Sequence, residues 1–186
     1  PSSISLTTAG ATNFENLTGT TSAETLNGDA NANILIGNRG ADTLNGNGGN
    51  DTLYAGLVGG ASDTDSDDNL YGGAGDDILY ASAGDNTLDG GTGADTIYSG
   101  TGSDVIVIRS GDGGSSISDA DTLADFSDGV DLIGLSSLQY SDLTVEQGTG
   151  SYSSHVVIKK TDTGEFLIII QNTSLSDIDD NDFSAI

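Results

Sequence analysis

The sequence predicts an all-β chain that folds as a parallel β-roll, in which short strands stack into a regular solenoid. A pattern of nine residues recurs ten times between Gly10 and Val107. Its clearest copy runs from Gly72 to Tyr80 and consists of a Gly-rich turn, acidic residues and one apolar residue between two flanking positions. A fixed period of this length is typical of a solenoid, because each repeat buries its apolar side chain only against neighbouring repeats.

Two positions of the repeat keep their chemistry in all ten copies. The eighth position is always apolar: Leu17, Leu26, Leu35, Leu44, Leu53, Leu70, Leu79, Leu88, Ile97 and Ile106. The sixth position always carries a side-chain oxygen: Glu15, Glu24, Asn33, Asp42, Asp51, Asp68, Asp77, Asn86, Asp95 and Asp104. The first and fourth positions are mostly Gly, as in Gly72 and Gly75, which permits positive φ angles and lets backbone carbonyls approach one another.

These repeats resemble those of the RTX (repeats-in-toxin) family, whose pattern is G-G-x-G-x-D-x-U-x with U apolar. The stretches from Gly72 to Tyr80 and from Gly90 to Tyr98 match this pattern in full. The resemblance implies two nonapeptides per right-handed coil, turns that stack two repeats apart, and several Ca²⁺ ions held between neighbouring turns. Carbonyl and carboxylate oxygens bind Ca²⁺ without His or Cys, and the chain has one His and no Cys.

The expected calcium ligands are side chains at the sixth position and backbone carbonyls of the same turns. They are Gly37, Arg39, Asp42, Gly46, Gly48, Asp51, Asp68, Gly72, Ala74, Asp77, Asn86, Gly90, Thr92, Asp95, Ser99, Thr101 and Asp104, with Asn33, Asp121 and Asp131 as further candidates. A lone Asp in such a turn usually bonds its own backbone. Two stacked columns of acids, with neighbours about 4.8 Å apart, favour cation binding instead.

The expected affinity is graded along the chain. We expect poor binding at the first turns, because Glu15 and Glu24 are a methylene longer than Asp and Asn33 is neutral. Asn86 is also neutral and predicts weaker binding than Asp77 or Asp95.

The charge of the chain points the same way. It contains 29 acidic residues and four Lys or Arg, a net charge of −25. Phosphate contacts need Lys and Arg, so nucleic acid is excluded as a partner. High net charge with few apolar residues predicts a chain that is disordered without metal and folds when it binds calcium. Extracellular calcium modules bind at about 10⁻⁴ to 10⁻³ M, so folding is expected outside the cell.

No catalytic motif is recognisable. The chain lacks H-E-x-x-H, G-x-S-x-G and P-loop motifs, and His155 has no evident catalytic partner. We therefore predict that this chain is not an enzyme, although an enzyme domain could precede it in a longer protein.

The period divides the chain into a lead-in of residues 1–9, a roll of residues 10–108 and a C-terminal β-rich cap of residues 109–186. One turn, residues 55–67, is eight residues longer than the others. Its Asp63, Asp65 and Asp67 do not complete an EF-hand loop, so we interpret it as a solvated acidic insertion.

The cap is expected to close the open end of the solenoid. Its segments 121–126 and 131–135 resemble the D-x-I-x-D-F…D-x-I-D-L stretch that follows RTX repeats, and strands are predicted for 143–147, 155–159 and 166–171. The tail, residues 175–186, resembles an uncleaved type I secretion signal. A last strand of the cap is the alternative, and the two are compatible.

An outer stripe of apolar residues accompanies the odd-numbered repeats. It consists of Ile34, Ile36, Tyr54, Ile78, Tyr80 and Tyr98, at the positions that flank the buried residue. An apolar stripe on an acidic surface usually marks something that covers it. Our hypothesis is that the cap folds back over the stripe, with a partner or a second copy as the alternative.

By resemblance, the expected function is that of the C-terminal domain of a large bacterial RTX adhesin, a group that includes an ice-binding adhesin. Such a domain folds on calcium outside the cell and stabilises the exported protein. The expected partners are the type I secretion apparatus and upstream adhesin domains; we expect a monomer that does not insert into membranes. Pro1 in place of Met suggests a piece of a longer protein.

Two other functions were weighed. A polysaccharide-binding module like those of secreted alginate epimerases is the alternative, although a polyanion would be repelled by the net charge of −25. Ice binding by this chain is disfavoured, because the outward turn positions form no regular array of Thr and Asn.

Overall fold

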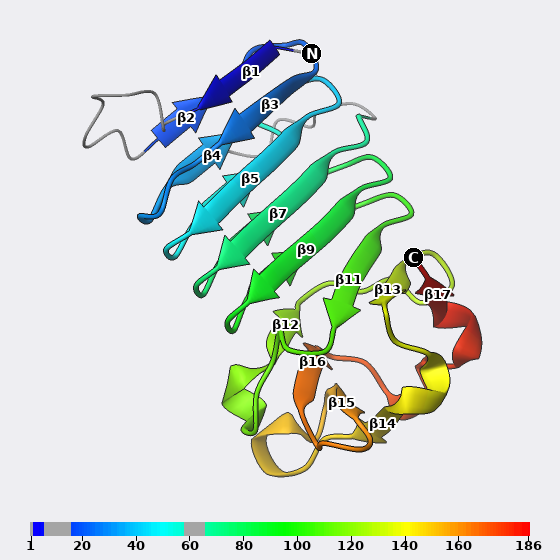
Figure 1. The fold of residues 1–186 in the computed structure, drawn as a ribbon. Coiled ribbons are helices and arrows are strands. Elements are labelled where there is room, and N and C mark those ends of the chain that lie inside the picture. Colours follow the sequence, from blue (N-terminus) through cyan, green and yellow to red (C-terminus); the bar gives the residue numbers. More distant parts are fainter. Residues whose placement is uncertain (1, 6–15, 58–65) are drawn as a thin grey trace.

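The computed structural model describes residues 2–5, 16–57 and 66–186 (Figure 1). The described strands form two sheets whose apolar faces share one core, so the chain is a flattened parallel solenoid with a smaller β-rich end. The predicted fold class, an all-β parallel β-roll, is confirmed.

The described strands alternate between the two sheets along most of the chain. In spatial order, the first sheet contains β1 (Ser2–Ser5), β3 (Glu24–Asn27), β5 (Thr43–Gly48), β7 (Asn69–Ala74), β9 (Thr87–Thr92), β11 (Val105–Arg109), β13 (Leu132–Ser136) and β17 (Phe183–Ala185). The second contains β14 (Leu143–Gln147), β15 (Val156–Lys160), β16 (Phe166–Ile170), β12 (Asp121–Leu123), β10 (Thr96–Tyr98), β8 (Ile78–Tyr80), β6 (Thr52–Tyr54), β4 (Ile34–Ile36) and β2 (Asn16–Thr18). The helical elements are short 3₁₀ turns: η1 (Ile117–Asp119), η2 (Tyr140–Asp142), η3 (Gly150–Tyr152), η4 (Leu175–Asp177) and η5 (Asp180–Asp182).

The eighth position of the repeat forms the core of the roll. Each of these residues pairs in register with its counterpart two repeats away, as Leu44 does with Leu70 and Leu53 with Leu79. All of them from Leu26 to Ile106 are fully buried. The eight extra residues counted before Asp68 do not change the register, because β5 still pairs with β7 and β6 with β8. Residues 58–65, with Asp63 and Asp65 of the acidic insertion, lie outside the described residues.

The strand stacking continues beyond the last repeat. β12 extends the second sheet and β13 the first, both parallel to the roll strands beside them. β16 pairs in parallel with β12. β15 then pairs antiparallel with β16, and β14 pairs antiparallel with β15 at the end of that sheet. The predicted strands at 143–147, 155–159 and 166–171 lie within a residue of these elements. The tail ends in β17, which pairs with β13.

The lead-in also contributes a strand, which the repeat pattern does not reveal. β1 pairs in parallel with β3, and Ile4 lies in register with Leu26. No helix in the described parts of the chain is long and apolar enough to cross a membrane.

The hypothesis that the cap folds back over the outer stripe is wrong. The strands of 109–186 extend the two sheets at their ends, where their edges bond to roll strands, instead of packing on an outer face. Ile34 and Ile78 remain 39% and 36% exposed. The rings of Tyr54, Tyr80 and Tyr98 stack on one another, with centroids 4.9 and 4.7 Å apart. The Tyr residues therefore bury part of their apolar surface against each other.

Candidate metal centre: two columns of turns

The turns of the solenoid stack in two columns, one on each side of the roll. Their sixth positions, extended by two residues of the cap, form a first column of Asn33, Asp51, Asp77, Asp95 and Asp121 and a second column of Glu24, Asp42, Asp68, Asn86, Asp104 and Asp131. Every one of these side chains is buried. The structure therefore contains the two separate columns of acids that the sequence predicts.

A ladder of hydrogen bonds runs along each column. The backbone N–H of each sixth-position residue donates to the side-chain Oδ1 of the residue one coil further on, at 2.6 to 3.1 Å. The ladder passes the long turn, where Asp42 bonds Asp68, and enters the cap, where Asp95 bonds Asp121 and Asp104 bonds Asp131. One carboxylate oxygen of each acid is thus occupied by the backbone.

The second oxygen of four of these acids has no hydrogen bond to any described residue. The Oδ2 atoms of Asp51, Asp77, Asp95 and Asp104 are buried and lack a partner among the residues that the structure describes. A buried charged oxygen without a partner is costly, because it has lost water and gained nothing in exchange.

Backbone carbonyls converge on the same places. A β-carbon built on Gly37 would lie 2.6 Å from Asp42 Oδ2 and 2.5 Å from the carbonyl oxygen of Ala55. At Gly46 it would lie 2.5 Å from the Gly72 carbonyl oxygen and also contact Asp51 Oδ2. Only Gly leaves these oxygens a common space, so the turns form cradles of carboxylate and carbonyl oxygen.

Burial raises the pKa of the acids in these cradles. The pKa of Asp77 rises from its ordinary value of 3.8 to about 7, and that of Asp51 to about 6, because burial disfavours the charged form. Asp95 and Asp104 also have a pKa of about 6 for the same reason. At neutral pH these sites either carry a costly charge or bind a cation.

The donor set fits Ca²⁺. Carboxylate and carbonyl oxygens are the ligands that Ca²⁺ prefers, and its flexible geometry suits ligands drawn from two successive turns. In the described residues no group of three or more His, Cys, Asp or Glu side chains gathers around one point. Carbonyls must therefore supply much of any coordination shell here. A bound Ca²⁺ would neutralise the carboxylates that face it.

The first turns differ in the way the sequence predicts. Glu24 accepts hydrogen bonds from the backbone N–H of Thr20, at 2.6 Å, and from its hydroxyl. The amide oxygen of Asn33 accepts the N–H of Asp29 at 2.8 Å. Both side chains are occupied within their own turns, which supports weak calcium binding there. Glu15 lies outside the described residues.

The side-chain amide of Asn86 makes hydrogen bonds inside its own column of turns. Its Nδ2 donates to the Gly84 carbonyl and to Asp104 Oδ1, both at 2.9 Å. These bonds direct a donor toward oxygens that would otherwise face a cation. The expectation of weaker binding at Asn86 remains a prediction, now with a geometric reason.

The other proposed ligands divide into two groups. First-position residues Gly37, Gly46, Gly72, Gly90 and Ser99 are buried beside the carboxylates. Third-position residues Arg39, Ala74, Thr92 and Thr101 are exposed at the rim of the turns, and Gly48 is half-buried. Their role as ligands stays a prediction for both groups.

A partly buried ionic cluster at the junction of roll and cap was not predicted. Arg109 pairs with Asp89 and, at 3.4 Å, with Asp112. Burial raises the pKa of Asp112 to about 6, although Arg109 opposes this shift. The only signal in the sequence is that Arg109 is one of four Lys or Arg residues in the chain.

The first cap motif also holds the roll through Asp125. Its Oδ1 accepts the N–H of Ser99 at 2.8 Å, and its Oδ2 accepts the N–H of Gly100 at 3.1 Å. Asp121 and Asp125 together bind the backbone of the preceding turns, so this segment is a continuation of the ladder.

Asp77→Asn is expected to raise the calcium concentration at the folding midpoint about tenfold or more, which is the effect of losing one charge-assisted contact. The amide oxygen can still accept the Asp51 N–H, while the amide nitrogen replaces the unpartnered Oδ2. A calcium titration followed by circular dichroism measures the midpoint. Asp76→Asn is the matched control, because Asp76 is exposed in the same turn; equal midpoints for the two variants would contradict the assignment.

A parallel roll whose turns stack buried carboxylates against backbone carbonyls defines a calcium-binding repeat protein. The sequence model for the RTX calcium-binding nonapeptide repeat matches this chain in four copies, at residues 18–57, 62–97, 71–106 and 80–114. Because these matches cover half of the chain, it belongs to the RTX calcium-binding repeat family. These repeats are a structural calcium-binding motif.

Two solved structures match along most of this chain at low sequence identity. The extracellular lipase LipA from Serratia marcescens is 13% identical with a TM-score of 0.40, and the match covers 97% of this chain and 42% of the lipase. The AlgE6R3 subunit of the Azotobacter vinelandii mannuronan C5-epimerase is 20% identical with a TM-score of 0.34, covering 89% of this chain and 80% of that one. This chain thus spans less than half of the lipase. A comparison with curated protein sequences finds no match.

Proposed function

We propose that this chain is the calcium-dependent folding and export domain at the C-terminus of a large extracellular bacterial adhesin. The observation that carries the proposal is the pair of turn columns, in which buried carboxylate oxygens lack a partner among the described residues. In a compartment with little calcium these oxygens repel each other and oppose folding. Outside the cell, several bound ions would neutralise them and close the roll.

The cap supports the stabilising part of this role. Asp121, Asp125 and Asp131 bond the backbone of the last three turns, so the cap completes both ladders. On this side the two sheets end in the three-residue strand β17 and in the antiparallel strand β14 instead of long parallel roll strands, and short edge strands limit edge-to-edge association.

We further propose that the tail, residues 175–186, is read by a type I secretion apparatus. Deletion of this segment is expected to leave a fused reporter inside cells that carry such an apparatus. Because the deletion also removes β17, a scrambled tail of identical composition is the control for length and charge. Undiminished release of the reporter without residues 175–186 would reject the export role.

The polysaccharide module is not proposed in its polyanion-binding form. The chain carries four Lys or Arg against 29 acids, and three of the four, Arg109, Lys159 and Lys160, pair with carboxylates of the chain itself.

A further inference from the structure

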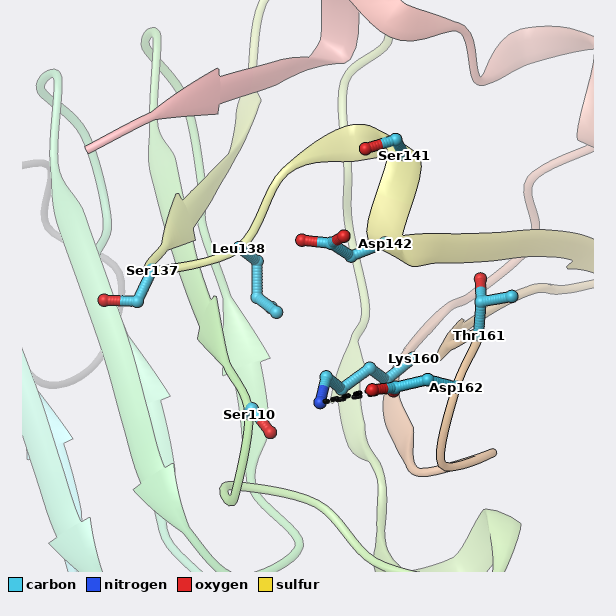
Figure 2. A pocket seen from close by; sticks show the side chains of 8 residues that line it. All are labelled: Ser110, Ser137, Leu138, Ser141, Asp142, Lys160, Thr161 and Asp162. Atoms are coloured by element: carbon cyan, nitrogen blue, oxygen red, sulfur yellow. Dashed lines mark hydrogen bonds and ion pairs between the residues drawn. The ribbon is translucent and has the colours of Figure 1, made fainter.

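An open cleft of about 490 Å³ lies in the cap, next to the end of β11 (Figure 2). Three segments far apart in the sequence form it: the end of the β11 segment with Ser110, the loop from β13 to η2, and the turn after β15. Its lining is Ser110, Ser137, Leu138, Ser141, Asp142, Lys160, Thr161 and Asp162. The calcium columns and the outer stripe contribute none of these residues.

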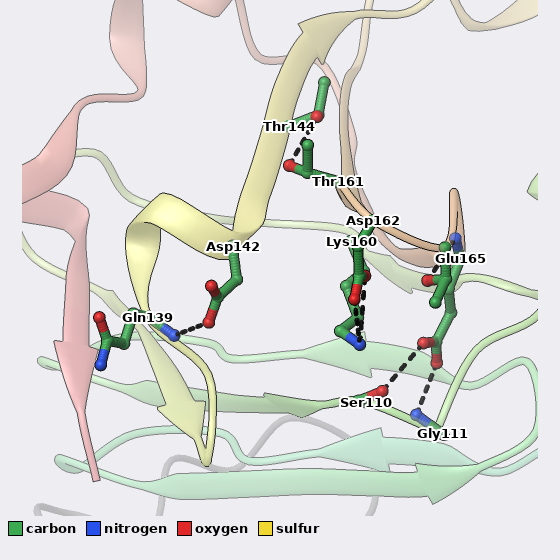
Figure 3. Close-up of polar contacts among 10 residues, drawn as sticks. Ser110, Gly111, Gln139, Asp142, Thr144, Lys160, Thr161, Asp162 and Glu165 are labelled. Carbon is green, nitrogen blue, oxygen red and sulfur yellow. Dashed lines mark hydrogen bonds and ion pairs between the residues drawn. The ribbon is translucent and has the colours of Figure 1, made fainter.

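Two charged groups line the cleft. Asp142 is exposed, and its Oδ2 accepts the N–H of Gln139 at 2.9 Å, while no described residue bonds its Oδ1 (Figure 3). Lys160 has a mostly buried side chain, and its ammonium lies 3.2 Å from Asp162 Oδ1. In Figure 2 the Asp142 carboxylate and the Lys160 ammonium both point into the space beside Leu138. The burial of the Lys stem limits where its charge can go.

Hydroxyl groups complete the lining. Ser137 and Ser141 have no side-chain hydrogen bonds, and Ser137 is held at a φ of 59°, a conformation that non-Gly residues rarely adopt. Thr161 bonds Thr144 through its hydroxyl at 2.9 Å, and Ser110 bonds Glu165 at 3.2 Å (Figure 3). The cleft thus presents both donors and acceptors around one apolar side chain.

This chemistry suits a neutral polyhydroxylated ligand. An ionised carboxylate accepts hydrogen bonds strongly, an ammonium only donates, and Ser hydroxyls do both, as the hydroxyl groups of a sugar do. Leu138 lies at the base of the cleft and is only 6% exposed, so hydrogen bonds to the polar groups would supply most of the binding. A free anion would meet Asp142, Asp162 and the net charge of −25.

We propose that this cleft binds one neutral sugar residue, such as the terminal hexose of a glycan. Binding requires the cap to be folded, because Ser110 directly follows β11 while Lys160 is the last residue of β15. The proposal is independent of export and of the parent adhesin.

The test uses the full chain saturated with calcium, with its fold verified by circular dichroism. Saturation-transfer NMR and calorimetry with the methyl glycosides of glucose, galactose, mannose and fucose should reveal binding of at least one, with a Kd on the order of 1 mM for a ligand of about a dozen heavy atoms. Asp142→Asn and Lys160→Met should each weaken it about tenfold.

Asp177→Asn is the matched control. Asp177 accepts the Ser174 N–H at 3.2 Å at the start of η4, as Asp142 accepts that of Gln139 at η2, but it lies outside the cleft. The site is supported if Asp177→Asn binds the sugar fully while Asp142→Asn and Lys160→Met bind it more weakly. Free glycine, which carries an ammonium and a carboxylate but no hydroxyl group, is a further probe. The proposal is overturned if no sugar binds the folded protein, if both cleft variants bind as the unsubstituted chain does, or if glycine binds and the sugars do not.

Discussion

Removal of calcium at neutral pH is expected to unfold the roll. The two columns contain four carboxylates whose Oδ2 atoms are buried without a partner among the described residues, in a chain of net charge −25. Without a cation these charges are both desolvated and mutually repulsive, which destabilises the folded state. Each repeat buries only one apolar side chain in the core, and that burial offsets little of this destabilisation. Far-ultraviolet circular dichroism should show strand signal in millimolar calcium and its loss in excess EGTA.

Two further measurements sharpen this result. Added calcium should restore the strand signal, whereas an equal concentration of Mg²⁺ should not, because Mg²⁺ demands octahedral geometry and dehydrates reluctantly. Strand signal that persists unchanged in EGTA would refute metal-coupled folding.

Acidification is expected to act in opposite directions with and without calcium. Burial raises the pKa of Asp77 to about 7 and of Asp51, Asp95 and Asp104 to about 6, above the ordinary value of 3.8. In the metal-free roll these groups contribute stability that is fully present below the ordinary pKa and is lost as the pH rises through 6 to 7. The metal-free chain should therefore be more structured at about pH 5 than at about pH 8.

Calcium binding needs the ionised form of the same groups. The calcium concentration at the folding midpoint should rise as the pH falls below about 7, because protons then compete with calcium. Calcium titrations at several pH values, with metal-free protein prepared without chelator, measure both trends. Asp77→Asn should reduce the pH dependence strongly and Asp76→Asn only slightly, because the Asp76 charge is a minor cause of the raised pKa of Asp77 and burial is the largest. A midpoint independent of pH would contradict the buried, ionisable cradle.

The core and the columns could be predicted from the sequence because each depends on one repeated position. Leu44 and Leu70 have to stack if the repeats stack, and the same argument places Asp51 beside Asp77. The further candidates Asp121 and Asp131 are found at the ends of the two ladders. What binds at these positions still depends on the experiments above.

Other features depend on contacts that no period encodes. The pattern shows that Ile34 and Ile78 face outward, but not what packs against them, and the cap extends the sheets instead of covering these residues. The strand at Ile4 is out of the nine-residue register. Ser110, Asp142 and Lys160 come from separate segments and form no motif, so the cleft required a structure.

Along this roll, the place of a residue depends on the coil to which it belongs and not on the number of residues that separate it from its neighbour in the column. Asp42 and Asp68 are 26 residues apart and Asp77 and Asp95 are 18 apart, yet both pairs make the same hydrogen bond. A change in the number of residues between Ala55 and Ser66 should therefore leave the pairing of β5 with β7 and of β6 with β8 unchanged.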